Sequence, residues 1–162
     1  MKYLVLVISL LLEAIFSNIV SLNSLLIPLF LITSLVIIYP YFCKKNINFF
    51  LVCLVSGFLY DLIFADSLFI NTLSFSFAGI IIILGYSYVN YSIYSSNILN
   101  IIVIILYRII SYLLLCIIGY TTFNENILLS GVSSSLILNI IYGLILYLVI
   151  DMISKIFVIK RA

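Results

Sequence analysis

Apolar residues fill six long windows of the chain, with short polar interruptions between them. The windows are 3–21, 25–43, 47–65, 67–87, 98–119 and 128–150. A helix needs about 20 mostly apolar residues to cross the hydrocarbon core of a bilayer, and each window comes near that length. The runs are rich in Leu and Ile and lack the alternation of a barrel strand, so they predict helices. We therefore expect one domain over 1–162, a single bundle of six transmembrane helices.

The composition supports a membrane environment. Of the 162 residues, 67% are hydrophobic and 7% are charged, and the mean hydropathy is +1.46. A soluble domain carries about 25% charged residues, so the polar surface is too small to cover a water-soluble globule. The sequence predicts an all-α integral membrane protein whose solvent is the lipid bilayer. The net charge of +2 gives no reason to expect nucleic acid as a partner.

The first window has features of a signal peptide, because Lys2 precedes an apolar run. However, Glu13 interrupts that run and no Ala-x-Ala-like cleavage site follows. We interpret the window as the first membrane helix, with removal by a signal peptidase as the alternative.

The basic residues predict the orientation, because cytoplasmic loops of membrane proteins carry an excess of Lys and Arg. With a cytoplasmic N-terminus, six of the seven basic residues lie on that side: Lys2, Lys44, Lys45, Lys155, Lys160 and Arg161. Five helices instead of six would separate the basic loop from the basic C-terminal tail. We therefore expect both termini to be cytoplasmic. The longest connection, VNYSIYSSNI, has the Ser, Tyr and Asn content of an interfacial loop.

Two charged residues fall near the middle of the bilayer. Glu13 and Arg108 each lie about ten residues from the cytoplasmic end of their window, which corresponds to a depth of roughly 15 Å. An unpaired charge at the helix centre costs at least about 2.5–3.5 kcal/mol on insertion scales. We expect a Glu13–Arg108 ion pair between the first and fifth helices. The alternative is separate partners, such as backbone carbonyls or the hydroxyls of Ser111 and Tyr112.

Small and polar residues recur at four-residue spacing along some windows. Such ridges allow helix backbones to approach closely and to form hydrogen bonds between helices. We expect internal packing of the bundle, with a docking surface for another protein as the alternative. The sixth window contains the ridge Gly131, Ser135, Asn139 and Gly143, and the first contains Ser9, Glu13, Ser17 and Ser21.

The residue types offer little for catalysis. The chain has no histidine, which excludes a Ser-His-Asp triad and a histidine metal site. The three cysteines, Cys43, Cys53 and Cys116, form no CxxC pair, and we interpret them as packing residues. The pair Tyr60–Asp61 is found in intramembrane aspartyl proteases, but the second aspartate motif is missing. We expect no enzyme activity, no metal and no cofactor.

One stretch resembles a known family. The segment GFLYDLIFADSLFINTL, residues 57–73, is similar to the characteristic segment of the rod shape-determining protein MreD family. Gly57, Asp61, Leu68 and Asn71 match the family pattern, and Phe69 stands where the family usually has glycine. The chain length, the number of windows and the short basic tail also resemble that family.

This resemblance implies a non-enzymatic scaffold in the bacterial plasma membrane, within the complex that elongates the peptidoglycan wall. It implies binding of an MreC-like bitopic protein, with RodA, a class B penicillin-binding protein and MreB as further partners. It also implies a six-helix fold similar to the substrate-binding subunits of ECF transporters.

Two interpretations of the acidic residues in this motif remain open. Asp61 can accept hydrogen bonds from Asn71 and from backbone N–H groups at the start of the fourth helix, where negative charge is favoured. Alternatively, Asp61 and Asp66 present a surface to the MreC-like partner.

Two alternatives for the whole protein also remain open. An ECF-type substrate-binding subunit would capture a vitamin-sized ligand near the outer face, with Glu13 and Arg108 serving the ligand. A handler of lipid-linked precursors would use Arg108 to bind a pyrophosphate.

Overall fold

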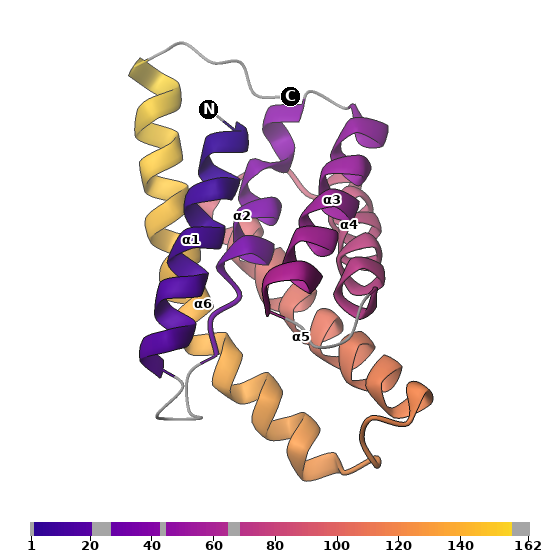
Figure 1. The fold of residues 1–162 in the computed structure, drawn as a ribbon. Coiled ribbons are helices and arrows are strands. Elements are labelled where there is room, and N and C mark those ends of the chain that lie inside the picture. The colour runs from indigo at the N-terminus through magenta and orange to yellow at the C-terminus, as the bar shows by residue number, and fades with distance from the viewer. Residues whose placement is uncertain (1, 21–26, 43–44, 65–68, 157–162) are drawn as a thin grey trace.

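The computed structural model describes residues 2–20, 27–42, 45–64 and 69–156, which form helices and no strand. Successive helices run in opposite directions and pack side by side (Figure 1). Their bounds are α1 Lys2–Val20, α2 Phe30–Ile38, the 3₁₀-helix η1 Tyr39–Phe42, α3 Asn46–Phe64, α4 Ile70–Tyr88, α5 Ile93–Ile118 and α6 Glu125–Ile156.

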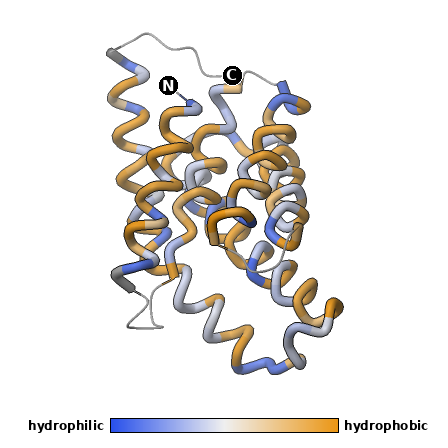
Figure 2. The backbone as a smooth tube through the Cα atoms, in the orientation of Figure 1, coloured by the Kyte–Doolittle hydropathy of each residue, from blue (hydrophilic) through white to orange (hydrophobic). Residues whose placement is uncertain are grey.

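The chain is an all-α, multi-pass membrane protein by the length and composition of its helices. Four helices in the described part of the chain, α3 to α6, are long and apolar enough to cross a bilayer, and Phe30–Phe42 is a shorter apolar segment. Hydrophobic residues cover most of their length, and a hydrophilic stretch marks the start of α6 (Figure 2). Many large apolar side chains are exposed on these helices, as expected where lipid is the solvent.

The second apolar window does not form one long helix. Residues 27–29 are irregular, and α2 with η1 covers thirteen residues, roughly 20 Å of rise. Every residue of α2 is buried, and the helix contacts α1, α4, α5 and α6. Because this segment is enclosed by protein, its irregular backbone can find partners away from lipid. The predicted span 25–43 is therefore a short central helix with a non-helical entry.

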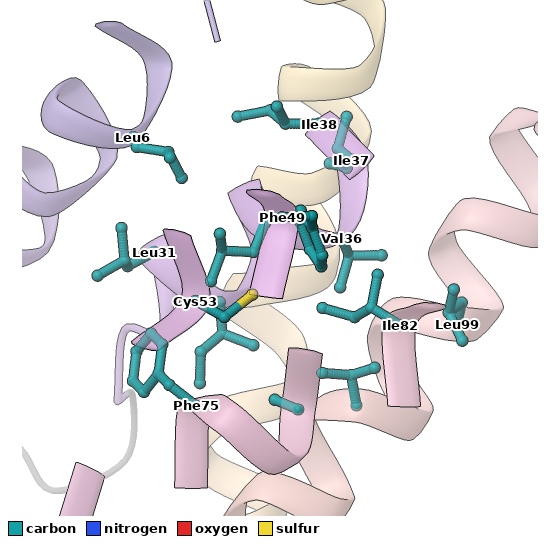
Figure 3. Packing of buried hydrophobic residues seen from close by; sticks show 14 of the residues in the cluster. Leu6, Leu31, Val36, Ile37, Ile38, Phe49, Cys53, Phe75, Ile82 and Leu99 are labelled. Atoms are coloured by element: carbon teal, nitrogen blue, oxygen red, sulfur yellow. The ribbon is translucent and has the colours of Figure 1, made fainter. Parts of the chain in front are cut away.

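Helices α3 and α4 form a closely packed hairpin. A Cβ atom built at Gly57 would lie 2.8 Å from the Cβ atom of Phe75, closer than side chains tolerate. A Cβ atom at Gly79 would lie 2.9 Å from the sulfur of Cys53. Phe49 and Cys53 of α3 and Phe75 of α4 contribute to the same buried cluster as the side chains of α2 (Figure 3). Glycine at both positions thus sets the short distance between the two helices.

Helix α5 begins five residues before the predicted window, at Ile93. The backbone N–H of Ser95 donates to Oγ of Ser92 at 3.2 Å, and that of Ser92 donates to Oγ of Ser95 at 2.9 Å. This capping box satisfies donors at the helix start. Because α5 begins at Ile93, the connection between α4 and α5 is shorter than the predicted interfacial loop.

Helices α5 and α6 are the longest, and their connected ends extend beyond the other helices (Figure 1). The side chains at this tip are exposed and include Ile117, Tyr120, Phe123 and Ile127. The start of α1, the start of α3 and the end of α6 lie at the opposite end. Lys2, Lys45 and Lys155 thus share one end, as the charge pattern predicts, whereas Lys44, Lys160 and Arg161 lie outside the described residues.

The glycines allow a matched test of helix packing. We expect Gly57→Ala to destabilise the protein by about 2 kcal/mol, because the new methyl group would force α3 and α4 apart. Gly131→Ala is the control, because a Cβ atom there meets no atom within 4 Å. The measurement is a titration of the folded protein with a denaturing detergent. Equal effects of the two variants would contradict the close-packing argument.

Candidate functional site

Glu13 lies at the start of the central helix rather than against a basic side chain. Glu13 is fully buried, and its Oε2 accepts a hydrogen bond from the backbone N–H of Leu31 at 2.9 Å. The N-cap residue of α2, Leu29, has no polar side chain to satisfy the first N–H groups of the helix. The carboxylate from α1 takes that role, and its negative charge is favoured at a helix N-terminus.

Asn139 of α6 holds the irregular segment that leads into α2. Its Oδ1 accepts a hydrogen bond from the N–H of Leu29 at 2.8 Å, and its Nδ2 donates to the carbonyl of Ile27 at 3.1 Å. The N–H of Ile27 also donates to the carbonyl of Ser134 at 3.3 Å. Side chains from α1 and α6 therefore satisfy the backbone of this entry from two sides.

Asp61 lies at the start of α4 in the same kind of arrangement. Its side chain is 1% exposed; Oδ1 accepts from the N–H of Asn71 at 3.0 Å, and Oδ2 accepts from the N–H of Thr72 at 2.8 Å. The hydroxyl of Thr72 also donates to Oδ2, at 2.6 Å. The N-cap residue of α4 is Phe69, which makes no side-chain capping bond. Asp61 thus acts as a helix-capping carboxylate for α4, the other helix of its hairpin.

The side chain of Asn71 points to a different helix. Its Oδ1 accepts a hydrogen bond from the hydroxyl of Tyr107 at 2.6 Å, which links α4 to α5. Tyr107 is 3% exposed, so its hydroxyl needs a partner inside the protein. Asn71 thus donates to Asp61 through its backbone N–H, while its side chain bonds to Tyr107.

The structure does not form the ion pair expected between Glu13 and Arg108. Among the described residues, the acidic and basic side chains within 4.0 Å of each other are Asp151 and Lys155, at 2.7 Å. The positive charge of Arg108 attracts the carboxylate of Glu13 from a distance, without an ion pair. The hydroxyl of Tyr60 also lies near that carboxylate. Glu13 accepts its hydrogen bond from the backbone at the start of α2 instead of from the guanidinium of Arg108.

Arg108 keeps donors without acceptors in the described part of the chain. Its Nε and Nη2 atoms are buried and have no hydrogen-bond partner there, nor has Oε1 of Glu13. The alternative partners do not replace the ion pair. The hydroxyl of Ser111 donates to the carbonyl of Arg108 itself, and the hydroxyl of Tyr112 donates to the carbonyls of Thr122 and Asn124.

Phe69 adopts a backbone conformation that favours glycine. Its φ angle is 74° and its ψ angle is −7°, in the left-handed region. A bulky side chain is rarely found there because its Cβ atom crowds the backbone. Position 69 is therefore one where glycine would have a physical advantage over phenylalanine. The hairpin nevertheless closes tightly, as the contacts around Gly57 show.

The other predicted site residues divide into two groups. Gly57, Asp61 and Asn71 come together at the α3–α4 hairpin, whereas Asp66 lies outside the described residues. Three residues of the α6 ridge contribute to packing or hydrogen bonds inside the bundle: Ser135, Asn139 and Gly143. Gly131 does not allow a close helix contact, because a Cβ atom there would lie in open space, although its carbonyl accepts hydrogen bonds from the hydroxyls of Ser134 and Ser135.

Sequence reasoning missed several partners. Thr72 follows the motif residue Asn71, and Tyr107 precedes Arg108, but nothing in their spacing indicates their contacts. The role of Asn139 could have been suspected from a carboxamide inside an apolar window.

No group of three or more metal-ligating residues gathers in the described part of the chain. Comparisons with protein-family models, with curated proteins and with solved structures find no match.

The capping role of Asp61 can be tested by removing its charge. We expect Asp61→Asn to destabilise the protein by about 2–3 kcal/mol, because an amide loses charge-assisted bonds and turns a donor toward N–H groups. The matched control is Glu125→Gln, since Glu125 is exposed at the start of α6. Both variants are compared by detergent denaturation. Unfolding of the two variants at the same detergent concentration would contradict the capping role of Asp61.

The strain at Phe69 predicts a stabilising substitution. We expect Phe69→Gly to stabilise the protein by about 1 kcal/mol, because glycine adopts a positive φ angle without the steric cost. The lost packing is small, since Phe69 is 57% exposed. Phe69→Ala is the control, because alanine removes the ring and keeps the Cβ atom. A destabilised Phe69→Gly variant would show that the ring matters more than the backbone conformation.

Proposed function

We propose that the chain is a non-enzymatic membrane scaffold of a bacterial cell-wall elongation complex, of the MreD type. It binds an MreC-like bitopic protein in the plasma membrane and supports peptidoglycan synthesis and cell shape. RodA, a class B penicillin-binding protein and MreB are its further partners. In this proposal the chain crosses the bilayer six times, the second time through the short helix α2 with η1 and its irregular entry, and both termini are cytoplasmic.

The observation that carries the proposal is the α3–α4 hairpin. Three of the four residues that match the family pattern lie together there, and each makes a structural contact: Gly57 allows close packing, Asp61 caps α4 and Asn71 binds Tyr107. The fourth, Leu68, lies outside the described residues. A carboxylate held by backbone N–H groups and a hydroxyl is poorly suited to act as a catalytic base. The motif thus supports a role in fixing the shape of the bundle.

The extended tip of α5 and α6 is the surface we assign to the MreC-like protein. It lies at the end opposite Lys2 and Lys45, which is the extracytoplasmic end in the proposed orientation. Its apolar side chains are exposed, and a partner with one membrane helix and an extracytoplasmic coiled coil can contact both the helices and their tip. In this assignment Asp61 acts indirectly, because it is buried away from that surface.

A second candidate is an ECF-type substrate-binding subunit for a vitamin-sized ligand. The observation in its favour is the buried polar atoms near the middle of the bundle, Oε1 of Glu13 and the Nε and Nη2 atoms of Arg108. A ligand with matching groups would satisfy them. Against it, Glu13 already caps α2 through its other oxygen.

Purification distinguishes these two functions. The tagged protein is extracted from its native membranes in a mild detergent, and the proteins that accompany it are identified by mass spectrometry. We expect enrichment of a single-span coiled-coil protein together with RodA or a transpeptidase, and we expect a Phe123→Asp, Ile127→Asp double variant at the tip to lose them. An ATPase pair with a coupling membrane subunit, without wall-synthesis proteins, would contradict the scaffold and favour the transporter.

A further inference from the structure

A cavity of about 670 Å³ lies at the end of the bundle that carries Lys2 and Lys45. It is bordered by η1, the start of α3, the end of α4 and the short connection that follows. Its volume falls within the range of small-molecule sites, about 300–1,000 Å³. None of the motif residues or midplane charges discussed above contributes to its lining.

Tyrosine rings form one wall of this cavity. The rings of Tyr39 and Tyr86 stack with centroids 5.3 Å apart and an interplanar angle of 16°. The ring of Tyr91 lies 6.1 Å from that of Tyr86 and 5.1 Å from that of Tyr147. Tyrosines that only anchor a helix at the membrane surface point outward, as the exposed Tyr88 does at 86%. The three lining tyrosines are half-buried and hold one another in place, as in a preformed site.

The polar groups of the cavity are neutral. The hydroxyl of Tyr39 donates to Oδ1 of Asn46 at 2.9 Å, which leaves the Nδ2 group of Asn46 to donate to another acceptor. The exposed side chain of Asn90 adds a second carboxamide. Burial raises the pKa of the Tyr91 hydroxyl, so this group also stays uncharged. No charged side chain lines the cavity in the described part of the chain.

The remaining wall is apolar and continues along the lipid-facing surface of α4. Ile83 and Leu84 line the cavity, and Leu84 is 54% exposed on a helix that can cross the bilayer. The cavity therefore combines a polar, aromatic wall with an apolar wall on a helix that can cross the bilayer. A ligand that fits both parts is an amphiphile whose hydrocarbon chain remains in the bilayer.

We propose that this cavity binds the uncharged sugar headgroup of a membrane lipid. The tyrosine rings provide flat apolar surfaces for the C–H faces of a sugar ring, and the asparagine amides provide donors and acceptors for its hydroxyls. A phosphate headgroup would need a cationic side chain, and the described residues of the lining include none. The sugar is carried directly on a diacylglycerol, because a sugar on a polyprenyl phosphate would bring a negative charge to this lining.

The test uses the full chain reconstituted in nanodiscs with equal amounts of phosphatidylcholine, phosphatidylglycerol and monoglucosyl diacylglycerol. The protein is then extracted, and native mass spectrometry counts the lipids that remain bound. We expect the glucosyl lipid to be retained about 10-fold more often than either of the other two lipids, which corresponds to a preference of about 1.4 kcal/mol. A parallel mixture with glucose on a polyprenyl phosphate tests the charge argument, and we expect weaker retention of that lipid because its phosphate meets no cation among the described lining residues. Because only this chain is present, the result does not depend on the wall-elongation partners.

Matched variants locate the binding. We expect Asn46→Ala to reduce retention of the glucosyl lipid about 5-fold through the loss of one net hydrogen bond, and Tyr86→Ala to abolish it. Asn126→Ala and Tyr88→Ala are the controls, because both residues are exposed and neither lines the cavity. Since Asn46 is exposed, its variant is expected to fold normally even if Tyr86→Ala does not.

Three results would overturn the proposal. The first is equal retention of the three lipids. The second is a preference for phosphatidylglycerol that disappears in Lys45→Gln, which would indicate an anionic-lipid site. The third is a glucosyl-lipid preference that Asn46→Ala leaves unchanged, which would place the sugar elsewhere on the protein.

Discussion

Backbone N–H groups inside a membrane must find acceptors within the protein, because hydrocarbon offers none. This requirement is most demanding where a helix begins, since its first N–H groups have no partner in their own helix. Helices α2 and α4 both begin after an apolar N-cap residue, Leu29 and Phe69. In each case a carboxylate from the neighbouring helix accepts the N–H groups, Glu13 for α2 and Asp61 for α4. The rest of the bundle is arranged around these two helix starts.

The same requirement explains why the two charges near the midplane do not pair directly. A carboxylate at a helix start accepts short hydrogen bonds from N–H groups whose positions the backbone fixes, and it also interacts with the helix dipole. A flexible arginine must lose side-chain freedom to compete for that position. Glu13 therefore remains with Leu31, and Asn139 completes the entry to α2 from α6. The central helix is held by polar contacts at one end and by apolar packing along its whole length.

The sequence was informative about the candidate site where its residues lie close along the chain. Gly57, Asp61 and Asn71 belong to two helices that follow each other in the sequence, so their spacing brings them to one hairpin. Asp61 could be placed near the start of the next helix for this reason. Tyr107 and Asn139 are far from their partners in sequence, at separations of 36 and 110 residues, so no local pattern indicates them. The cavity was equally hidden, because Tyr39 is far in sequence from Tyr86 and Tyr91.

The sequence by itself determined that this is an all-α membrane protein, because hydropathy belongs to each residue and accumulates over a window long enough to cross a bilayer. It also indicated small residues at close helix contacts, Gly57 and Gly143, but it included Gly131, which has no such contact. Only the tertiary structure decided that the second window is a short helix buried on all sides, and that Glu13 caps it instead of pairing with Arg108. The reason is that an acceptor is assigned by distance and direction in space. Those depend on how all the helices pack together, and no stretch of sequence contains that arrangement.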